Sequence, residues 1–156
     1  MSQRETVRRG TSADIPTVME IGKQSTTAPR WQLTDYDMIF RTERTLLVAE
    51  SEGRIVGFVI GHNLAGEWEL ENLVVGSEFR RRGIGERLVW ELILEAKRSK
   101  AEFIFLEARE SNSSARKLYE RCGFQQNGRR KDYYSNPPED AVLYRFLCNP
   151  KSLENC

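Results

Sequence analysis

An apolar strand, a basic glycine-containing turn and a long amphipathic helix follow one another between residues 67 and 96, and this unit constrains the fold most. The strand is predicted over Glu67 to Val75, where polar and apolar residues alternate before Leu73-Val74-Val75 ends it. Apolar residues then recur at helical spacing, namely Ile84, Leu88, Val89, Leu92, Ile93 and Ala96. An apolar stripe on a helix is normally buried, so the unit predicts a helix packed against a sheet.

The remaining segments alternate between short strands and helices. The patterns predict strands over 7–9, 45–50, 55–60, 102–108 and 141–147, with 45–50 and 55–60 forming a hairpin. They predict helices over 15–22, capped by Ser12 or Asp14, over 37–41, and from Ser113 to Gly123, with a polar loop at 25–36. No repeat or low-complexity linker interrupts the chain. We therefore expect one α/β (α+β) domain with a mixed sheet over residues 1–156.

Charge and composition exclude several classes of function. The formal net charge of the 156 residues is +1, so we expect neither nucleic acid nor a membrane surface as partner. No apolar run approaches the roughly 18 residues of a membrane helix, and the first residues lack the apolar core of a signal peptide. Three cysteines, Cys122, Cys148 and Cys156, have no metal-like spacing, which favours a reducing, cytoplasmic location. Cys122 is expected in a helix core, and His62 at the surface.

The turn Arg80-Arg81-Arg82-Gly83-Ile84-Gly85 has the composition of a phosphate site. Glycines permit close backbone approach, and the free N–H groups and dipole at a helix start attract anions, as do arginines. The third glycine of a dinucleotide fingerprint would fall at Leu88, and no Gly-Lys-Ser/Thr follows. The turn thus predicts a phosphate-bearing ligand other than NAD or a nucleoside triphosphate, although it also fits a basic turn before a surface helix.

Two stretches carry a family resemblance. Arg80-x-x-Gly83-x-Gly85 after Leu73-Val74-Val75 is similar to the acetyl-CoA motif of the GNAT acyltransferase superfamily. The run from Leu106 to Phe124 resembles the RimI branch, bacterial enzymes that acetylate the N-terminal alanine of a small-subunit ribosomal protein, and the related eukaryotic N-terminal acetyltransferases. The match covers residues 45–147. It implies a mostly antiparallel central sheet flanked by helices, with splayed parallel strands at the acetyl-CoA site.

The resemblance also implies which residues contact acetyl-CoA. The backbone of Leu73, Val74 and Val75 would pair with the pantetheine arm. Asn112 would be a further contact, and it also fits the role of a helix cap. The pyrophosphate would lie against Arg80, Arg81, Arg82, Gly83, Ile84, Gly85 and Glu86.

Acetyl transfer needs a neutral amine, stabilisation of the oxyanion and a proton for the leaving thiolate. The resemblance implies Glu107 as the base, acting through water, and Tyr119 as the acid that protonates the CoA sulfur. Tyr119 also fits a purely packing role, and Glu107 a salt bridge to Arg109 or Arg116. No metal is expected.

Glu69 and Glu71 share one face of their strand and are alternative bases. Some GNAT lysine acetyltransferases place their base at the position of Glu69, whereas a solvated strand face is the other interpretation. Trp31, Tyr133 and Tyr134 match residues that would contact the acceptor.

Three functions therefore stay open on the sequence alone. The first is acetylation of a protein N-terminus, in which case the partner is a protein or peptide such as a small-subunit ribosomal protein. The second is acetylation of lysine, a polyamine or another small amine. The third is a non-catalytic acyl-CoA-binding module, which would need neither Glu107 nor Tyr119. The oligomeric state and the natural acceptor are left open.

Overall fold

The computed structural model describes residues 5–25 and 29–149. Cys156 and residues 26–28 of the predicted loop therefore lie outside the described part. Within it, no helix has both the length and the apolar character needed to cross a membrane.

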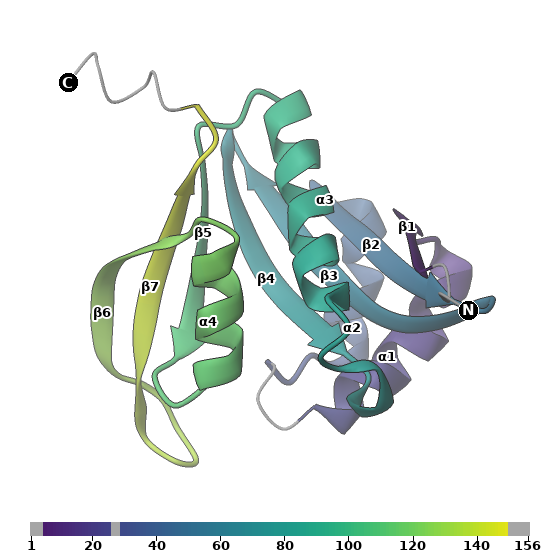
Figure 1. Cartoon of the computed structure of the whole chain (residues 1–156), viewed down its shortest axis with the longest axis horizontal. Coiled ribbons are helices and arrows are strands. Elements are labelled where there is room, and N and C mark those ends of the chain that lie inside the picture. The colour runs from purple at the N-terminus through teal and green to yellow at the C-terminus, as the bar shows by residue number, and fades with distance from the viewer. Residues whose placement is uncertain (1–4, 26–28, 150–156) are drawn as a thin grey trace.

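A seven-stranded sheet in the order β1-β2-β3-β4-β5-β7-β6 forms the centre of the molecule (Figure 1). Its strands are β1 (Glu5–Arg9), β2 (Arg44–Ser51), β3 (Arg54–Leu64), β4 (Glu67–Val75), β5 (Phe103–Arg109), β6 (Gln125–Tyr134) and β7 (Glu139–Leu147). Every neighbouring pair is antiparallel except β4 and β5, which are parallel. The prediction of a mostly antiparallel sheet flanked by helices is confirmed.

The parallel pair β4–β5 separates soon after it forms. Only three residue pairs join the two strands, and the last is Glu69 with Phe105. β4 then continues to Val75 beside β3 alone, and the two strands diverge toward their C-terminal ends in Figure 1. These are the predicted splayed parallel strands.

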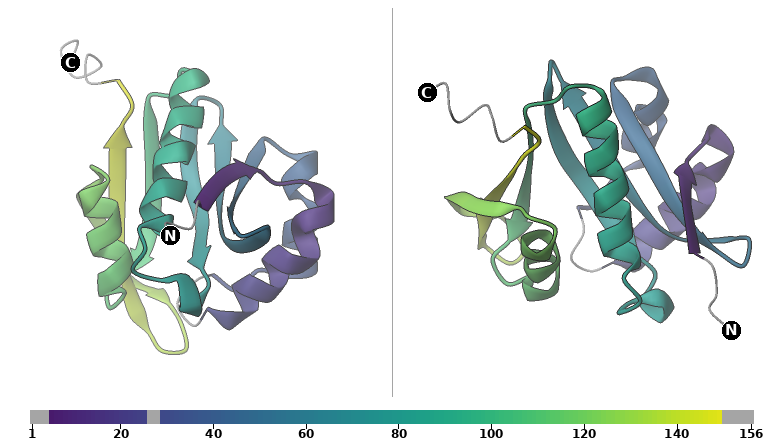
Figure 2. Two further views of the ribbon diagram at one scale, coloured as in Figure 1. Left: turned by 45° about the vertical axis from the view of Figure 1, so that its right-hand side comes forward. Right: turned by 45° about the horizontal axis from the view of Figure 1, so that its top comes forward.

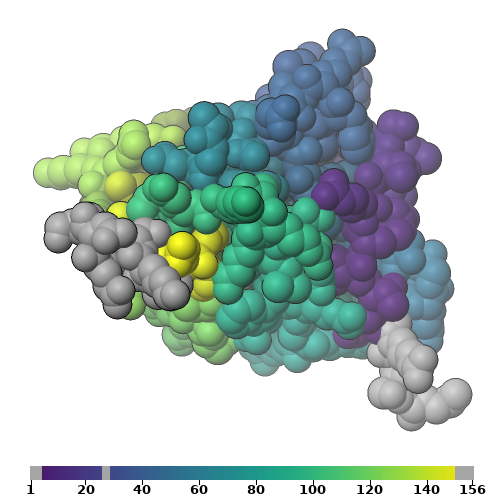
Figure 3. All heavy atoms as spheres, turned by 90° about the horizontal axis from the view of Figure 1, so that it is seen from above, coloured from purple at the N-terminus to yellow at the C-terminus, as the bar shows by residue number. Residues whose placement is uncertain are grey.

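Helices cover both faces of the sheet (Figure 2). The helices α1 (Ile15–Gln24) and α2 (Leu33–Asp37) pack on one face, around Val18, Tyr36 and Phe58. The helices α3 (Ile84–Arg98) and α4 (Ser113–Arg121) pack on the other. Viewed from the end where β4 and β5 are paired, α3 lies between the purple N-terminal and yellow-green C-terminal segments (Figure 3). The apolar stripe of α3 is buried as predicted, and so is Cys122.

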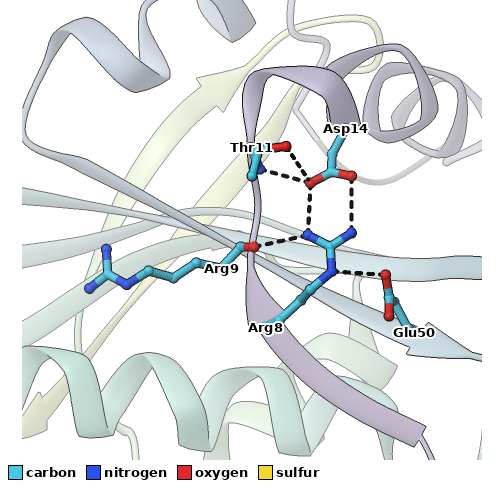
Figure 4. A network of polar contacts seen from close by, with 5 residues as sticks. All are labelled: Arg8, Arg9, Thr11, Asp14 and Glu50. Carbon is cyan, nitrogen blue, oxygen red and sulfur yellow. Dashed lines mark hydrogen bonds and ion pairs between the residues drawn. The ribbon is translucent and has the colours of Figure 1, made fainter. Parts of the chain in front are cut away.

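An arginine network joins β1, the start of α1 and β2 (Figure 4). The Arg8 guanidinium donates to both carboxylate oxygens of Asp14, at 2.9 and 3.0 Å, and to Glu50 at 2.8 Å. The backbone N–H of Thr11 donates to Asp14 at 2.7 Å. Of the two predicted caps, Asp14 occupies the N-cap position of α1, whereas Ser12 lies inside the 3-10 turn Ser12–Asp14, which Thr11 caps. One guanidinium thus links β1, the turn before α1 and β2.

The sequence patterns missed two elements. β6 was not predicted, because its residues Gln125–Tyr134 are polar, mostly exposed and lie at the sheet edge, so no alternation identifies it. α2 falls within the predicted loop 25–36, and the helix predicted over 37–41 is the end of α2 followed by the 3-10 turn Ile39–Arg41. β6 takes its structure from β7, whereas α2 has a local signal that the prediction overlooked, the hydrogen bond from the Gln32 N–H to the Asp35 carboxylate at 2.7 Å.

Candidate active site

The turn between β4 and α3 has the backbone of an anion site. Gly83 precedes α3 with φ 78°, in the left-handed region that favours glycine, and Arg81 has φ 64°. No neighbouring atom lies within 4 Å of the position a Cβ of Gly83 would take. The first N–H groups of a helix have no acceptor inside the helix, so those at the start of α3 are available to a ligand.

Six of the seven residues from Arg80 to Glu86 divide into two sets, and the seventh, Glu86, is half-buried and pairs with Arg121 of α4. Arg80, Arg81, Arg82 and Gly83 are exposed at the start of α3, whereas Ile84 and Gly85 are buried. A Cβ on Gly85 would lie 2.7 Å from Leu118 of α4. Gly85 is therefore needed for the approach of α4 to α3, a packing role that the sequence did not indicate.

The backbone of Leu73, Val74 and Val75 follows the point where β5 leaves. On its other edge it pairs with Val59, Phe58 and Gly57 of β3. The edge that faces β5 lies beyond the last β4–β5 pair. An extended chain with amide groups can add to such an edge as a further strand does.

Asn112 caps the start of α4, which is the second of the two roles predicted for it. Its side-chain oxygen accepts from the backbone N–H of Ala115 at 3.3 Å. Because β5 runs toward the divergent end of the sheet, α4 begins there, at the same end as α3 (Figure 1). Asn112 and Gly83 therefore both lie at the opening of the splay.

Tyr119 is buried between α4 and the sheet, with 7% of its surface exposed. Its ring centroid lies 5.8 Å from that of Phe124 and 6.3 Å from that of Tyr144. Burial first, and then the nearby Tyr134, raise the pKa of the Tyr119 phenol well above its usual value. Tyr119 is therefore an un-ionised phenol, close to Tyr134, in an apolar setting.

Glu107 lies on the opposite face of β5 from the core residues Leu106 and Ala108. Its carboxylate is 3.4 Å from Arg130, and a hydrogen bond with it is the main cause that raises the pKa of Tyr133. The predicted salt bridge to Arg109 or Arg116 is wrong. Arg109 pairs with Glu139 at 3.3 Å, and Arg116 donates to the Tyr144 hydroxyl at 2.9 Å. Both true partners of Glu107 come from β6, the strand that was not predicted.

Tyr133 and Tyr134 lie together at the end of β6. Their ring centroids are 5.1 Å apart, and Tyr133 is 49% exposed. Burial first, and then the Glu107 charge, raise the pKa of Tyr134 to about 12, and the Arg109 guanidinium lies 4.4 Å from its ring centre. Trp31 packs on Tyr36 at 5.4 Å, against the core beneath α1 and α2.

Glu69 and Glu71 occupy the face of β4 covered by α1 and α2, and His62 of β3 shares that face. Glu69 and Glu71 are half-buried, so the solvated-face interpretation is wrong. Burial first, and then the charges of Glu71 and Glu107, raise the pKa of the Glu69 carboxyl. The prediction that His62 lies at the surface is also wrong, since only 17% of its side chain is exposed. The ligand-type atoms of His62, Glu69 and Glu71 all lie within 4.8 Å of one another.

Known proteins resemble this chain in sequence and in structure. Residues 15–124 match the model of the acetyltransferase (GNAT) family. The ribosomal protein bS18-alanine N-acetyltransferase of Salmonella typhimurium is 31% identical over 135 residues, which are 85% of this chain and 90% of the relative.

Two solved structures share the fold. The Escherichia coli ribosomal-protein-S18-alanine N-acetyltransferase superposes with a TM-score of 0.81 at 24% identity, over 94% of this chain and 95% of the other. Salmonella typhimurium yncA, solved with its cofactor acetyl-CoA, superposes with a TM-score of 0.80 at 17% identity, again over 94% and 95%.

Proposed function

This chain belongs to the GNAT acetyltransferase family and is an N-acetyltransferase, and we propose that it transfers the acetyl group of acetyl-CoA to the N-terminal α-amine of a ribosomal protein. The observation that carries the proposal is the splay of β4 from β5. The anion-binding turn at Gly83 lies at the opening of this splay, and Tyr119 and Glu107 lie beside it on opposite faces of the sheet. We further propose that residues 1–156 act as one domain in the cytoplasm, where ribosomal acceptors are found.

The residues at the splay fit acetyl-CoA. The free edge of Leu73 to Val75 suits the amide groups of a pantetheine arm, and the start of α3 suits a pyrophosphate. Three exposed arginines, Arg80 to Arg82, add attraction for the phosphates. Asn112 supports the site by fixing the start of α4 beside it, a role compatible with a contact to the ligand.

The positions of Glu107 and Tyr119 on opposite faces of the sheet assign a different proton transfer to each. The acceptor amine approaches from the Glu107 face, and Glu107, through water, takes the proton that the nitrogen loses as the N–C bond forms. The C–S bond breaks, and Tyr119 supplies a proton to the sulfur from the other face. Arg130 and Tyr133 hold the Glu107 carboxylate in place. The space for the first residues of the acceptor is bordered by Tyr133, Tyr134 and Trp31.

The acidity of the acceptor's ammonium group, in addition to the names of the relatives, supports an N-terminal amine as the acceptor. An α-amine with a pKa of about 7.7–8.0 has a substantial neutral fraction near pH 7.5, whereas a lysine near 10.4 has about 0.1%. An amine that is already partly neutral needs only modest help from a carboxylate such as Glu107. Glu69, whose pKa is raised, favours lysine or a polyamine as the second candidate.

A panel of acceptors tests the proposal. Acetyl-CoA-dependent release of thiol would be followed with peptides that start in alanine, serine or methionine, with N-blocked peptides carrying lysine, and with a polyamine. We expect release with free N-termini, strongest for alanine. Release with lysine or polyamine alone would contradict the N-terminal acceptor, and acetyl-CoA binding without release for any amine would support the non-catalytic module.

A further inference from the structure

His62 lies on the same face of the sheet as Glu107, which is the face from which the acceptor amine approaches. Phe58 and Ile60 of β3 contribute to the core beneath α1 and α2, and alternation places His62 on the same face. His62 pairs directly with Glu69 in the β3–β4 ladder. The next register positions skip Glu71, which is the extra residue of a bulge.

The charged groups around His62 come from three strands. Its Nδ1 lies 4.0 Å from a carboxylate oxygen of Glu71 on β4. Arg44, its partner on β2, donates to both oxygens of that carboxylate, at 2.6 and 3.2 Å. Glu69 lies between this group and Glu107 of β5, and Tyr133 of β6 also acts on Glu69 electrostatically. Titratable groups therefore continue across the sheet from the Tyr133 end to His62.

Glu69 differs from the two carboxylates beside it. Arg44 forms an ion pair with Glu71, and Arg130 forms one with Glu107. Of the described groups that act on Glu69, Arg44 alone is cationic, and its effect is smaller than those of burial and of the two like charges. Glu69 therefore takes up a proton more readily than an ordinary exposed carboxylate does.

We propose that His62 is a positioning residue that acts through Glu69, relaying to solvent the proton that the acceptor ammonium must lose before it can attack. This inference rests on the proposed N-acetyltransferase activity. The ammonium proton passes to the Glu69 carboxylate, then to the imidazole of His62, and then to water, which reaches the 17% of the His62 side chain that is exposed.

Two carboxylates therefore handle two different protons. Glu69 and His62 remove the first, which leaves the acceptor nitrogen with its lone pair. The nitrogen then forms the N–C bond and loses its second proton to Glu107 through water, while the C–S bond breaks and Tyr119 protonates the sulfur. One proton is released to solvent for each ammonium acetylated. A divalent cation at His62, Glu69 and Glu71 is disfavoured, because Arg44 already holds the Glu71 carboxylate.

Chemical rescue tests the relay. We expect His62→Gln, in a chain without a histidine tag, to lower kcat about tenfold, leave the KM for acetyl-CoA unchanged, and recover activity as imidazole is added to the buffer. Glu69→Gln should lose at least as much and gain nothing from imidazole, because it acts before His62. The double variant should be no slower than Glu69→Gln. Glu67→Gln, the same charge change at an exposed position on the same strand face, should match wild type.

Other outcomes would overturn the relay. Loss of activity without rescue, or additive losses in the double variant, would give His62 a structural role only. If His62→Gln unfolds, His62→Asn takes its place. Because His62 is the only histidine, carbethoxylation of the wild-type imidazole gives a second measurement, and full activity after complete modification would also refute the relay. The rescue is measured with whichever amine is acetylated, so turnover on lysine alone would refute the N-terminal acceptor and leave the relay testable.

Discussion

Tyr119→Phe separates catalysis from packing, because it removes one oxygen from a buried ring. The pKa of Tyr119 is raised mainly by burial, so the phenol stays protonated throughout any practical assay range. Before it transfers its proton, the phenol donates a hydrogen bond to the sulfur on which negative charge develops, and Tyr119→Phe removes this hydrogen bond.

The size of the effect follows from that hydrogen bond. A hydrogen bond to a charged group contributes about 1.5–3 kcal/mol. Loss of that much transition-state stabilisation lowers kcat by about 10- to 150-fold. The ring contacts with Phe124 and Tyr144 remain, so the free energy of unfolding and the affinity for acetyl-CoA should change little.

Tyr144→Phe is the matched control. The Tyr144 ring neighbours that of Tyr119, but its hydroxyl accepts from Arg116 at 2.9 Å and donates to Glu120 at 3.1 Å. Removing it deletes hydrogen bonds to the partly buried Arg116 and the exposed Glu120, at about 0.5–1.5 kcal/mol of unfolding free energy. We expect kcat to stay within about twofold of wild type, since this hydroxyl takes no part in the chemistry.

The two variants are compared by thiol release at saturating acetyl-CoA, calorimetric binding of acetyl-CoA, and urea unfolding. A large loss of kcat in Tyr119→Phe together with a loss of stability in Tyr144→Phe supports the assignment. Full activity in Tyr119→Phe, or equal losses of kcat in both variants, would show that Tyr119 only packs.

Two further predictions concern the turn and the N-terminal network. Gly83→Ala should weaken acetyl-CoA binding at least about tenfold in calorimetry, whereas Gly66→Ala, which has φ 95° and equally open surroundings at the opposite end of β4, should show the same strain of about 1–2 kcal/mol and normal binding; equal binding in both would refute the role of the turn. Arg8 lowers the pKa of Asp14 to about 2. The stabilisation of the folded state by the Arg8–Asp14 ion pair is therefore complete above about pH 4 and is lost as the pH falls through 2. Asp14→Asn should thus lower the unfolding free energy at pH 7 by about 1–2 kcal/mol, allowing for solvent screening, and the difference from wild type should vanish toward pH 2; a difference independent of pH would contradict the ion pair.

The elements that periodicity defines could be predicted from the sequence. The stripe from Ile84 to Ala96 specifies α3, and alternation followed by an apolar end specifies β4. β6 has no apolar face, and its pairing with β7 alone defines it. The partners of Glu107 were mispredicted for the same reason, because Arg130 and Tyr133 belong to β6.

The surroundings of His62 could not be predicted either. Its burial depends on the bulge at Glu71 and on Arg44, which arrives from β2. Neither feature has a local sequence signal. The local sequence predicts that a histidine at the end of a hairpin is exposed, and only the strand order corrects this.

The short parallel ladder between β4 and β5 also bears on how the molecule opens. Only three residue pairs link the backbone of β1–β4 to that of β5–β7–β6, so most of the connection is made by side chains. The cluster that contains Leu92, Ile104 and Tyr119 spans both parts and supplies it. Because so few backbone pairs cross this seam, we expect it to open more readily than the rest of the sheet, by an amount that depends on how α3 packs. A ligand bound along the seam would add contacts to both parts and oppose that opening.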